Sequence, residues 1–419
     1  MHKEEKITQS QSHHNPSIAQ SPLKKWLSYL GPGIITAALV FGPGSLTITS
    51  KLGALFGYQL LWLIFVAIFF MIIFTEMSAR IGITTHASLL TIIKDKWGKI
   101  ASVVIGIGIF LITASFQAGN TIGASLAFAE LFHTEVVPWI IVFTSIAISL
   151  LFFRSFYKIL EKVMIALVGL MLLSFLITLM LARPQLTHLA KGLMPTLPSG
   201  AEMLSIALIA SSFSIAGAFY QSYLVKEKGW KVEEIKQGKR ESMVGVLILG
   251  LISSFILINA AAILHPQGIQ VNSATDMGLA LEPLYGNIAT VIFMLGLFGA
   301  SFSSLIGNAT IGGSLLSDAF SLGNQLQSKQ VRMMIMLVMV IGAAVALKFG
   351  RLPLELIVFA QAITILIAPL VGIALFLVAN DKAIMGPARN NLWKNIGGGL
   401  GLLLLIFLAI THLRLQFFN

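Results

Sequence analysis

Long apolar stretches dominate this chain and alternate with short polar segments. Runs of about 18 or more apolar residues are typical of helices that cross a membrane. Eleven such runs occur, and the largest loops between them, 226–242 and 265–286, hold only about twenty residues each. The pattern therefore predicts an all-α polytopic membrane protein without a separate soluble domain. The predicted spans are 31–56, 59–81, 101–130, 136–153, 162–182, 202–225, 243–264, 287–315, 332–350, 354–379 and 396–413.

Composition and charge support this interpretation. Of the 419 residues, 56% are hydrophobic and 11% are charged, whereas a soluble domain carries about 25% charged residues. The net charge of +11 comes from basic residues in the short segments between apolar runs, which indicates membrane topology and not nucleic-acid binding. With the N-terminus in the cytoplasm, 22 Lys and Arg residues lie inside and six outside. We therefore expect a cytoplasmic N-terminus, an external C-terminus and residence in the cell membrane.

The spans also suggest how the chain is organised. Residues 1–23 are polar and lack the apolar core of a signal peptide, so we expect a disordered cytoplasmic tail. Residues 24–380 are expected to form a ten-helix core, divided into two sets of five at about 31–182 and 202–379. Residues 381–419 hold the last cytoplasmic loop and the eleventh span.

Two spans contain breaks that a plain lipid-facing helix avoids. The first carries a Gly-Pro-Gly-Ser sequence at its centre, at 42–45, and the sixth carries small and hydroxyl residues over 211–218. Each of these spans opens one set of five, and interruptions at corresponding places in two halves are typical of inverted-repeat transporters. We expect unwinding near 42–45 and 212–217, with the two breaks facing each other at mid-membrane. The alternatives are a packed proline kink and a close-packing face.

The chain resembles the Nramp family of metal-ion transporters, which share the broken-helix fold first seen in the amino-acid transporter LeuT. The resemblance extends over all eleven spans and implies a LeuT-type 5+5 inverted repeat. The matching stretches are 31–33 and 42–45 in the first span, 51–62 at its turn into the second, 79–85, 295–304, Ala360-Gln361, and 385–393 in the last cytoplasmic loop.

The functional motifs of the family are changed here. Its first span reads Asp-Pro-Gly-Asn, and the metal-coordinating Asp and Asn correspond to Gly42 and Ser45. Its sixth span reads Met-Pro-His, which corresponds to Ser214, Ile215 and Ala216. The resemblance therefore implies the fold, but it does not carry over the thioether and carboxylate that bind the metal, so no metal ligand can be named.

The residues linked to proton movement are also changed. The acidic pair of the family's third span corresponds to Gln117 and Asn120, which we keep as possible coupling residues. Glu76 is an ionisable residue inside the second span and is a further candidate. Its alternative role is an intramolecular ion pair with Arg80, four residues later.

The expected substrate site is thus uncharged, with hydroxyls, an amide and unwound carbonyls. Neutral oxygens bind a strongly hydrated dication poorly. Serine and threonine hydroxyls in spans often donate instead to the carbonyl four residues earlier. The candidate substrate-binding residues are Gly42, Ser45, Thr47, Ser211, Ser214 and Gln361.

These observations favour a secondary transporter with weak or absent proton coupling. A transporter of a small non-metal solute and a non-transporting sensor on the same scaffold stay open as alternatives. No span holds the paired carboxylates or histidine clusters of a hydrolase, so we do not expect an enzyme, and nothing suggests a cofactor. The chain lacks a phosphate-binding Gly-Lys motif, and no ATP-hydrolysing partner is implied. Its partners should be the lipid bilayer and a small ion or molecule.

Overall fold

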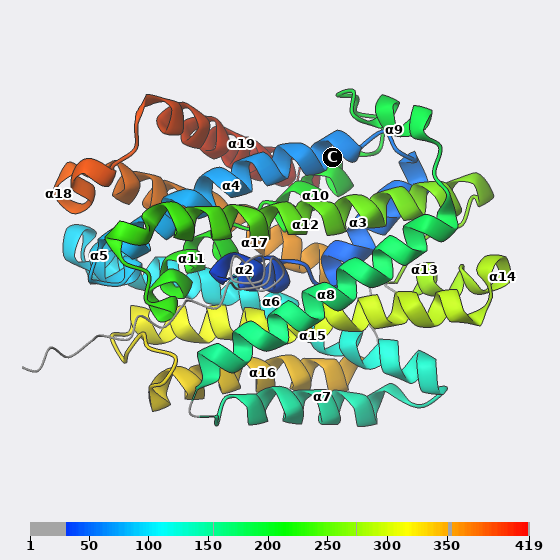
Figure 1. Cartoon of the computed structure of the whole chain (residues 1–419), viewed down its shortest axis with the longest axis horizontal. Coiled ribbons are helices and arrows are strands. Elements are labelled where there is room, and N and C mark those ends of the chain that lie inside the picture. The colour runs from blue at the N-terminus through cyan, green and yellow to red at the C-terminus, as the bar shows by residue number, and fades with distance from the viewer. Residues whose placement is uncertain (1–30, 154, 274, 351–353, 418–419) are drawn as a thin grey trace, which may run out of the picture.

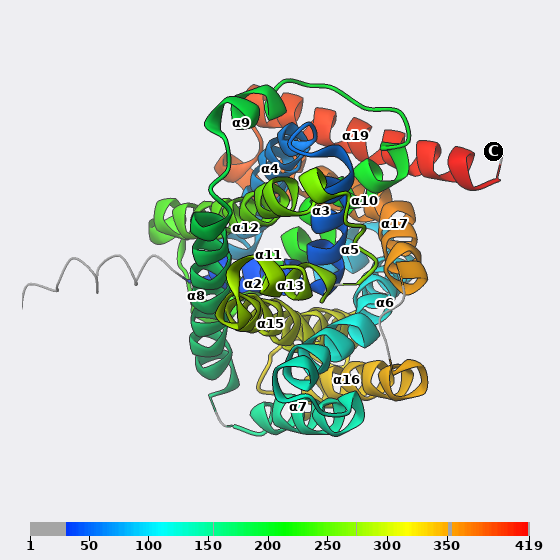
Figure 2. The same cartoon turned by 90° about the vertical axis from the view of Figure 1, so that its right-hand side faces the viewer.

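The computed structural model describes residues 31–153, 155–273, 275–350 and 354–417, and the predicted N-terminal tail lies outside these ranges. All regular elements within them are helices. The long helices run roughly side by side (Figure 1). The view along them shows α2, α3 and α11 near the middle of the bundle and α7, α16 and α19 at its edge (Figure 2).

The first half of the chain opens with two short helices in line and continues with long ones. The loop helix α5 follows α4, and the short helix α9 precedes the second half. The helices are α2 (Pro32–Val40), α3 (Pro43–Phe56), α4 (Leu61–Thr84), α5 (Leu89–Trp97), α6 (Lys99–Phe132), α7 (Val136–Leu150), α8 (Phe156–Ala182) and α9 (Leu186–Gly192).

The second half repeats this order, again beginning with two short helices. The chain ends with a short segment that contains α18 and with the long helix α19. The helices are α10 (Glu202–Ser212), α11 (Ile215–Lys228), α12 (Ile235–Ile263), α13 (Asp276–Leu279), α14 (Glu282–Tyr285), α15 (Asn287–Ala319), α16 (Lys329–Phe349), α17 (Leu354–Asn380), α18 (Lys382–Met385) and α19 (Leu392–Phe417), with single 3₁₀ turns at Val232–Glu234, His265–Gln267 and Gly386–Ala388.

The helices agree with the predicted spans except at some ends. Within the described residues, nine helices are long and apolar enough to cross a membrane, and the bent pair α2 and α3 adds a tenth. The fourth predicted span, 136–153, is the shorter apolar helix α7, which ends at Leu150. The helix α12 begins at Ile235, two turns before the predicted 243. Its first turns are polar, so apolar run length alone underestimates the helix.

Glycines bring α2 against α12 at unusually short range. A Cβ atom added at Gly33 would lie 2.0 Å from the carbonyl oxygen of Glu241, and one added at Gly245 would lie 1.8 Å from the carbonyl oxygen of Gly33. Only hydrogen atoms fit between these backbones, as at other close contacts between membrane helices. This contact holds the first half-helix of the broken span against the second half of the chain.

Candidate substrate site

The first span is broken at the glycine that precedes its central proline. The helix α2 ends at Val40 and α3 begins at Pro43, with an angle of 65° between them. Gly42 has extended backbone angles and is the N-cap of α3. Proline fits the first position of a helix because its missing N–H would have no partner there. The helix therefore restarts at once, and the break covers residues 41–42 and not the predicted 42–45.

The sixth span is broken at the corresponding place. The helix α10 ends at Ser212 and α11 begins at Ile215, with non-helical angles at Phe213 and Ser214. The Ser214 hydroxyl caps α11 by accepting a hydrogen bond from the Gly217 amide at 3.3 Å. Because serine is a favoured N-cap, the break closes after two residues and is shorter than the predicted 212–217.

A small cavity lies between the two breaks. It has a volume of about 30 Å³, and since one water needs about 10–15 Å³ on this measure, it holds one or two waters or a ligand of similar size. Its walls come from both broken spans and from α6, α15 and α17. The lining residues are Val40, Gly42, Gly44, Ser45, Ile112, Phe116, Asn120, Ala210, Ser211, Ser214, Ala216, Asn308 and Thr364.

Four of the six candidate substrate-binding residues line this cavity: Gly42, Ser45, Ser211 and Ser214. The Ser45 side chain is 5% exposed, and its hydroxyl has no hydrogen-bond partner among the described residues. The Ser211 hydroxyl donates to the Leu208 carbonyl at 3.0 Å. The arrangement thus presents hydroxyls and backbone groups to a ligand.

The other two candidates lie outside the cavity. The Thr47 hydroxyl donates to the carbonyl of Pro43 at 2.8 Å, one turn earlier in α3. Gln361 is buried in α17, and its amide has no hydrogen-bond partner within the described part of the chain. Both residues were predicted as polar groups of the expected site, but neither side chain lines the cavity.

The candidate coupling residues of the third span are bonded to α15. The Gln117 amide donates to the Leu305 carbonyl at 2.8 Å, and the Asn120 amide donates to the Ser304 carbonyl at 3.2 Å. Both side chains are buried. Asn120 also lines the cavity, whereas Gln117 does not. These amides tie two helices together and carry no charge.

Glu76 belongs to an ion-pair network at one end of the bundle. Its carboxylate lies 3.3 Å from Arg80, as the pairing alternative predicted, and it also reaches Lys239 at 2.7 Å and Lys394 at 2.9 Å. Arg80 in turn donates to the Asn390 side chain at 2.5 Å. The network joins α4, α12 and α19, and none of these residues lines the cavity.

Sequence reasoning missed Asn308 and Thr364 as cavity residues. Asn308 lies on α15, four residues beyond the stretch used for the resemblance, and its amide has no hydrogen-bond partner among the described residues. The Thr364 hydroxyl donates to the Ala360 carbonyl at 2.9 Å. An amide in the middle of a predicted span was the available signal for Asn308, because such groups are costly in lipid.

The cavity contains no formal charge and no sulfur. None of its lining residues is Asp, Glu, His, Cys or Met. Over the described ranges, no three or more His, Cys, Asp or Glu side chains gather where they could hold a metal ion. Divalent transition metals are bound by such ligands, so the chemistry of this site differs from that of a transition-metal site.

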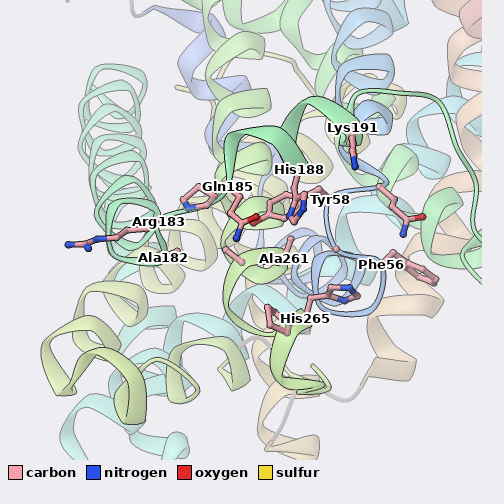
Figure 3. Close-up of a pocket in the computed structure, with 15 residues that line it drawn as sticks. Phe56, Tyr58, Ala182, Arg183, Gln185, His188, Lys191, Ala261 and His265 are labelled. Carbon is pink, nitrogen blue, oxygen red and sulfur yellow. The ribbon is translucent and has the colours of Figure 1, made fainter.

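A larger pocket of about 490 Å³ opens at the end of the bundle where α3, α8 and α12 finish. Its side chains include His188, Lys191 and His265, and no acidic residue is among those that line it (Figure 3). The His265 ring is fixed through Nδ1, which lies 2.8 Å from the Ala54 carbonyl. Burial raises the pKa of Tyr58 above its ordinary value, so this phenol is a neutral hydrogen-bond donor. The pocket thus carries basic side chains and no acidic one.

Comparison with known proteins places these features in a family. The sequence matches the family described as natural resistance-associated macrophage protein-like (Nramp) over residues 33–414. Curated relatives include the divalent metal cation transporter MntH of Pectobacterium carotovorum subsp. carotovorum, 27% identical over 404 residues that cover 94% of this chain and 95% of the relative. MntH of Staphylococcus saprophyticus is 25% identical over 94% of this chain and 92% of its own length.

Solved structures show the same fold. The manganese transporter of Eremococcus coleocola, in complex with an aromatic bis-isothiourea substituted compound, has a TM-score of 0.76 at 20% identity and covers 95% of this chain and 88% of its own. The transporter MhsT in complex with L-phenylalanine has a TM-score of 0.58 at 15% identity, covering 90% of this chain and 98% of its own. The predicted LeuT-type fold is therefore confirmed, and the chain belongs to the Nramp family of integral membrane secondary transporters.

Proposed function

We propose that this transporter moves its substrate through an uncharged site that binds manganese and iron much more weakly than its family membership implies. One observation carries the proposal: the cavity between the two helix breaks is lined by hydroxyls, amides and apolar groups, with Gly42 and Ser214 at positions that correspond to the family's Asp and Met. The curated relatives are named for divalent metal transport, so the alternative is that this chain also binds divalent metals. Titration with manganese distinguishes the two.

Coulomb's law gives the size of the effect. One carboxylate at 4 Å from a unit positive charge contributes about 4 kcal/mol at an effective dielectric constant of about 20, and the attraction is larger for a dication. Each ~1.4 kcal/mol changes the dissociation constant tenfold. The absence of that carboxylate therefore lowers affinity by orders of magnitude. Without a thioether, the site also loses its preference for softer ions over magnesium and calcium.

Proton coupling of the family's kind should likewise be weak or absent. The positions that correspond to its acidic pair and its histidine hold Gln117, Asn120 and Ala216. None of these side chains titrates near neutral pH. Internal pH in proteoliposomes should not respond to the substrate. Substrate-dependent proton entry that persists in Glu76→Gln would contradict this part of the proposal.

The orientation proposed from the Lys and Arg distribution places the N-terminus in the cytoplasm, the C-terminus outside and the protein in the cell membrane. On this orientation the basic pocket beside α9 lies at the external end of the transporter. The Glu76 network then lies at the cytoplasmic end.

Calorimetric titration of manganese tests the proposed site. We expect no heat from the wild type and measurable binding by the triple variant Gly42→Asp, Ser45→Asn, Ser214→Met. A Cβ at residue 42 would lie 2.8 Å from the Asn120 side-chain oxygen and 3.1 Å from the Ser304 hydroxyl, so Gly42→Ala is the matched steric control. Micromolar binding of manganese by the wild type, abolished by Ser45→Ala, would overturn the proposal and restore an ordinary metal transporter.

The second candidate substrate class is a small non-metal solute. The observation that favours it is the start of α3 in the cavity, where the N-cap is a glycine that makes no side-chain hydrogen bond to the helix. An uncapped helix start at mid-membrane is suited to a ligand that supplies the acceptor itself.

A further inference from the structure

We propose that the cavity binds a small carboxylate anion, with its oxygens at the N-terminus of α3. The inference rests on the proposed function, because it assumes an uncharged substrate site, and it goes further by naming the class of substrate. Four features carry it: the free amides of α3, unpartnered side chains in the same cavity, carbonyls that are already occupied, and the size of the cavity.

The first turn of α3 has amides without acceptors. Pro43 has no N–H, and the Leu46 amide bonds to the Gly42 carbonyl at 3.0 Å. The amides of Gly44 and Ser45 have no hydrogen-bond acceptor among the described residues. A helix of 14 residues carries a partial positive charge at this end. Two free amides at a helix start are the usual setting for a bound carboxylate or phosphate.

Two cavity side chains without partners, the buried Ser45 in the first turn of α3 and the partly buried Asn308 on α15, support the same ligand. The Ser45 hydroxyl is on a side chain that is 95% buried and has no partner within the described residues. The Asn308 amide, which enters the cavity from α15, also has none. A buried polar group without a partner costs free energy, and a ligand that accepts hydrogen bonds would recover it. Together with the amides, these groups offer donors from two helices.

The carbonyls at the end of α2 are less available to a cation. The Ala38 carbonyl accepts a hydrogen bond from the Ser303 hydroxyl at 3.0 Å, and the single proton of the Ser304 hydroxyl is shared between the Ala38 carbonyl at 3.3 Å and the Leu39 carbonyl at 3.4 Å. In broken-helix transporters such carbonyls coordinate cations while the opposite helix starts hold anions. The serines of α15 thus use these two carbonyls, while the Gly44 and Ser45 amides are free. These free donors favour an anion.

Cavity size restricts the anion to a few non-hydrogen atoms. At about 30 Å³ the space is too small for an amino acid of ordinary size, whereas formate or acetate displaces only one or two waters. The basic pocket near α9 adds a favourable field for anions, because its lining includes Arg183 and Lys191 but no acidic residue.

Ligand-dependent thermal stability of the purified full-length protein tests the proposal. Sodium acetate should stabilise it saturably at constant ionic strength, while acetamide, its neutral isostere, and methylammonium chloride should not. Removing one hydrogen bond to a charged ligand weakens binding about tenfold or more, so Ser45→Ala should raise the acetate dissociation constant by that factor. Gly42→Asp should abolish the effect, because its carboxylate would repel the anion. Thr49→Val, on the same helix but outside the cavity, is the matched control and should bind acetate normally.

The outcomes separate this inference from the proposed function. No response to acetate, an equal response to acetamide or to chloride alone, or full acetate binding by Ser45→Ala would overturn the carboxylate site. The uncharged-site proposal would stand if manganese still produced no heat. Micromolar manganese binding by the wild type would overturn both. If Gly42→Asp does not fold, the comparison of Ser45→Ala with Thr49→Val still decides the question.

Discussion

Replacing Glu76 with glutamine should destabilise the protein well beyond the loss of one surface ion pair. The Glu76 carboxylate is 18% exposed and bonds to Lys239 and Lys394, while Arg80, only 3% exposed, lies 3.3 Å away. The substitution keeps the size of the side chain but removes its charge. Three cations from three helices would then face one another without a counter-ion.

The magnitude follows from the burial of Arg80. Removing one partner of a buried ion pair costs about 3–5 kcal/mol, because the other charge stays buried. Glu76 is partly exposed and both lysines can turn towards water, so we expect the lower end of that range, about 3 kcal/mol. This loss should lower the midpoint of thermal unfolding in detergent by several degrees. The separation of α19 from the bundle should be the first step.

A matched control uses the same substitution at a simpler pair. Glu161 bonds to Lys228 at 2.5 Å, and the two side chains are 16% and 30% exposed. Such partly exposed pairs contribute about 0–1 kcal/mol, so Glu161→Gln should change the midpoint little. Equal midpoints for Glu76→Gln and Glu161→Gln would show that the network does not hold α19 and would refute this reasoning.

Two further predictions concern packing and topology. Gly245→Ala should sharply reduce the yield of folded protein, because the new methyl group would lie 1.8 Å from the Gly33 carbonyl oxygen. The control Gly169→Ala, with open space around it, should express normally. Size-exclusion chromatography of fluorescent fusions compares the two variants, and equal monodisperse peaks would count against the close contact. A reporter that is active only outside the cytoplasm should be active when fused after Asn419, and a reporter that is active only in the cytoplasm should be silent there, because the distribution of Lys and Arg determines the orientation. The opposite result would reverse the proposed topology.

Much of the fold could be predicted from run length and from two breaks. Apolar runs determine spans because a membrane leaves the backbone no other hydrogen-bond partners. Gly42 and Pro43 marked one break, and the hydroxyl-rich stretch near Ser214 marked the other. Helix ends were less accurate, since α12 continues into polar residues from Ile235 and α7 stops at Leu150. Those ends depend on tertiary contacts and on interfacial polar turns, which hydropathy does not detect.

The site was less predictable because it depends on side-chain direction. Ser45 and Thr47 are two residues apart on α3, so they point to different sides, and only Ser45 reaches the cavity. Gln361 is buried on α17 but outside the cavity, whereas Thr364, three residues later on the same face, lines it, so the position along the helix decides here. Asn308 went unnoticed because residue type alone does not show which face of a long helix meets the breaks. These assignments require the rotation of each helix about its axis, which the pattern of apolar residues does not define.

The neutral residues at and near this site support one another, because they take part in the hydrogen bonds that join the surrounding helices. Gln117 and Asn120 use their amides to bind α15, and Ser303 and Ser304 on α15 occupy the carbonyls at the end of α2. A charged pair at residues 117 and 120 would lose these amide donors, and a carboxylate at residue 42 would crowd Asn120. The hydrogen bonds between these helices therefore depend on neutral side chains at the positions where the family's motifs have charged ones. Restoring residue 42 alone should recover less manganese affinity than the triple variant, because Gly42→Asp supplies one carboxylate without the amide of Ser45→Asn and the thioether of Ser214→Met.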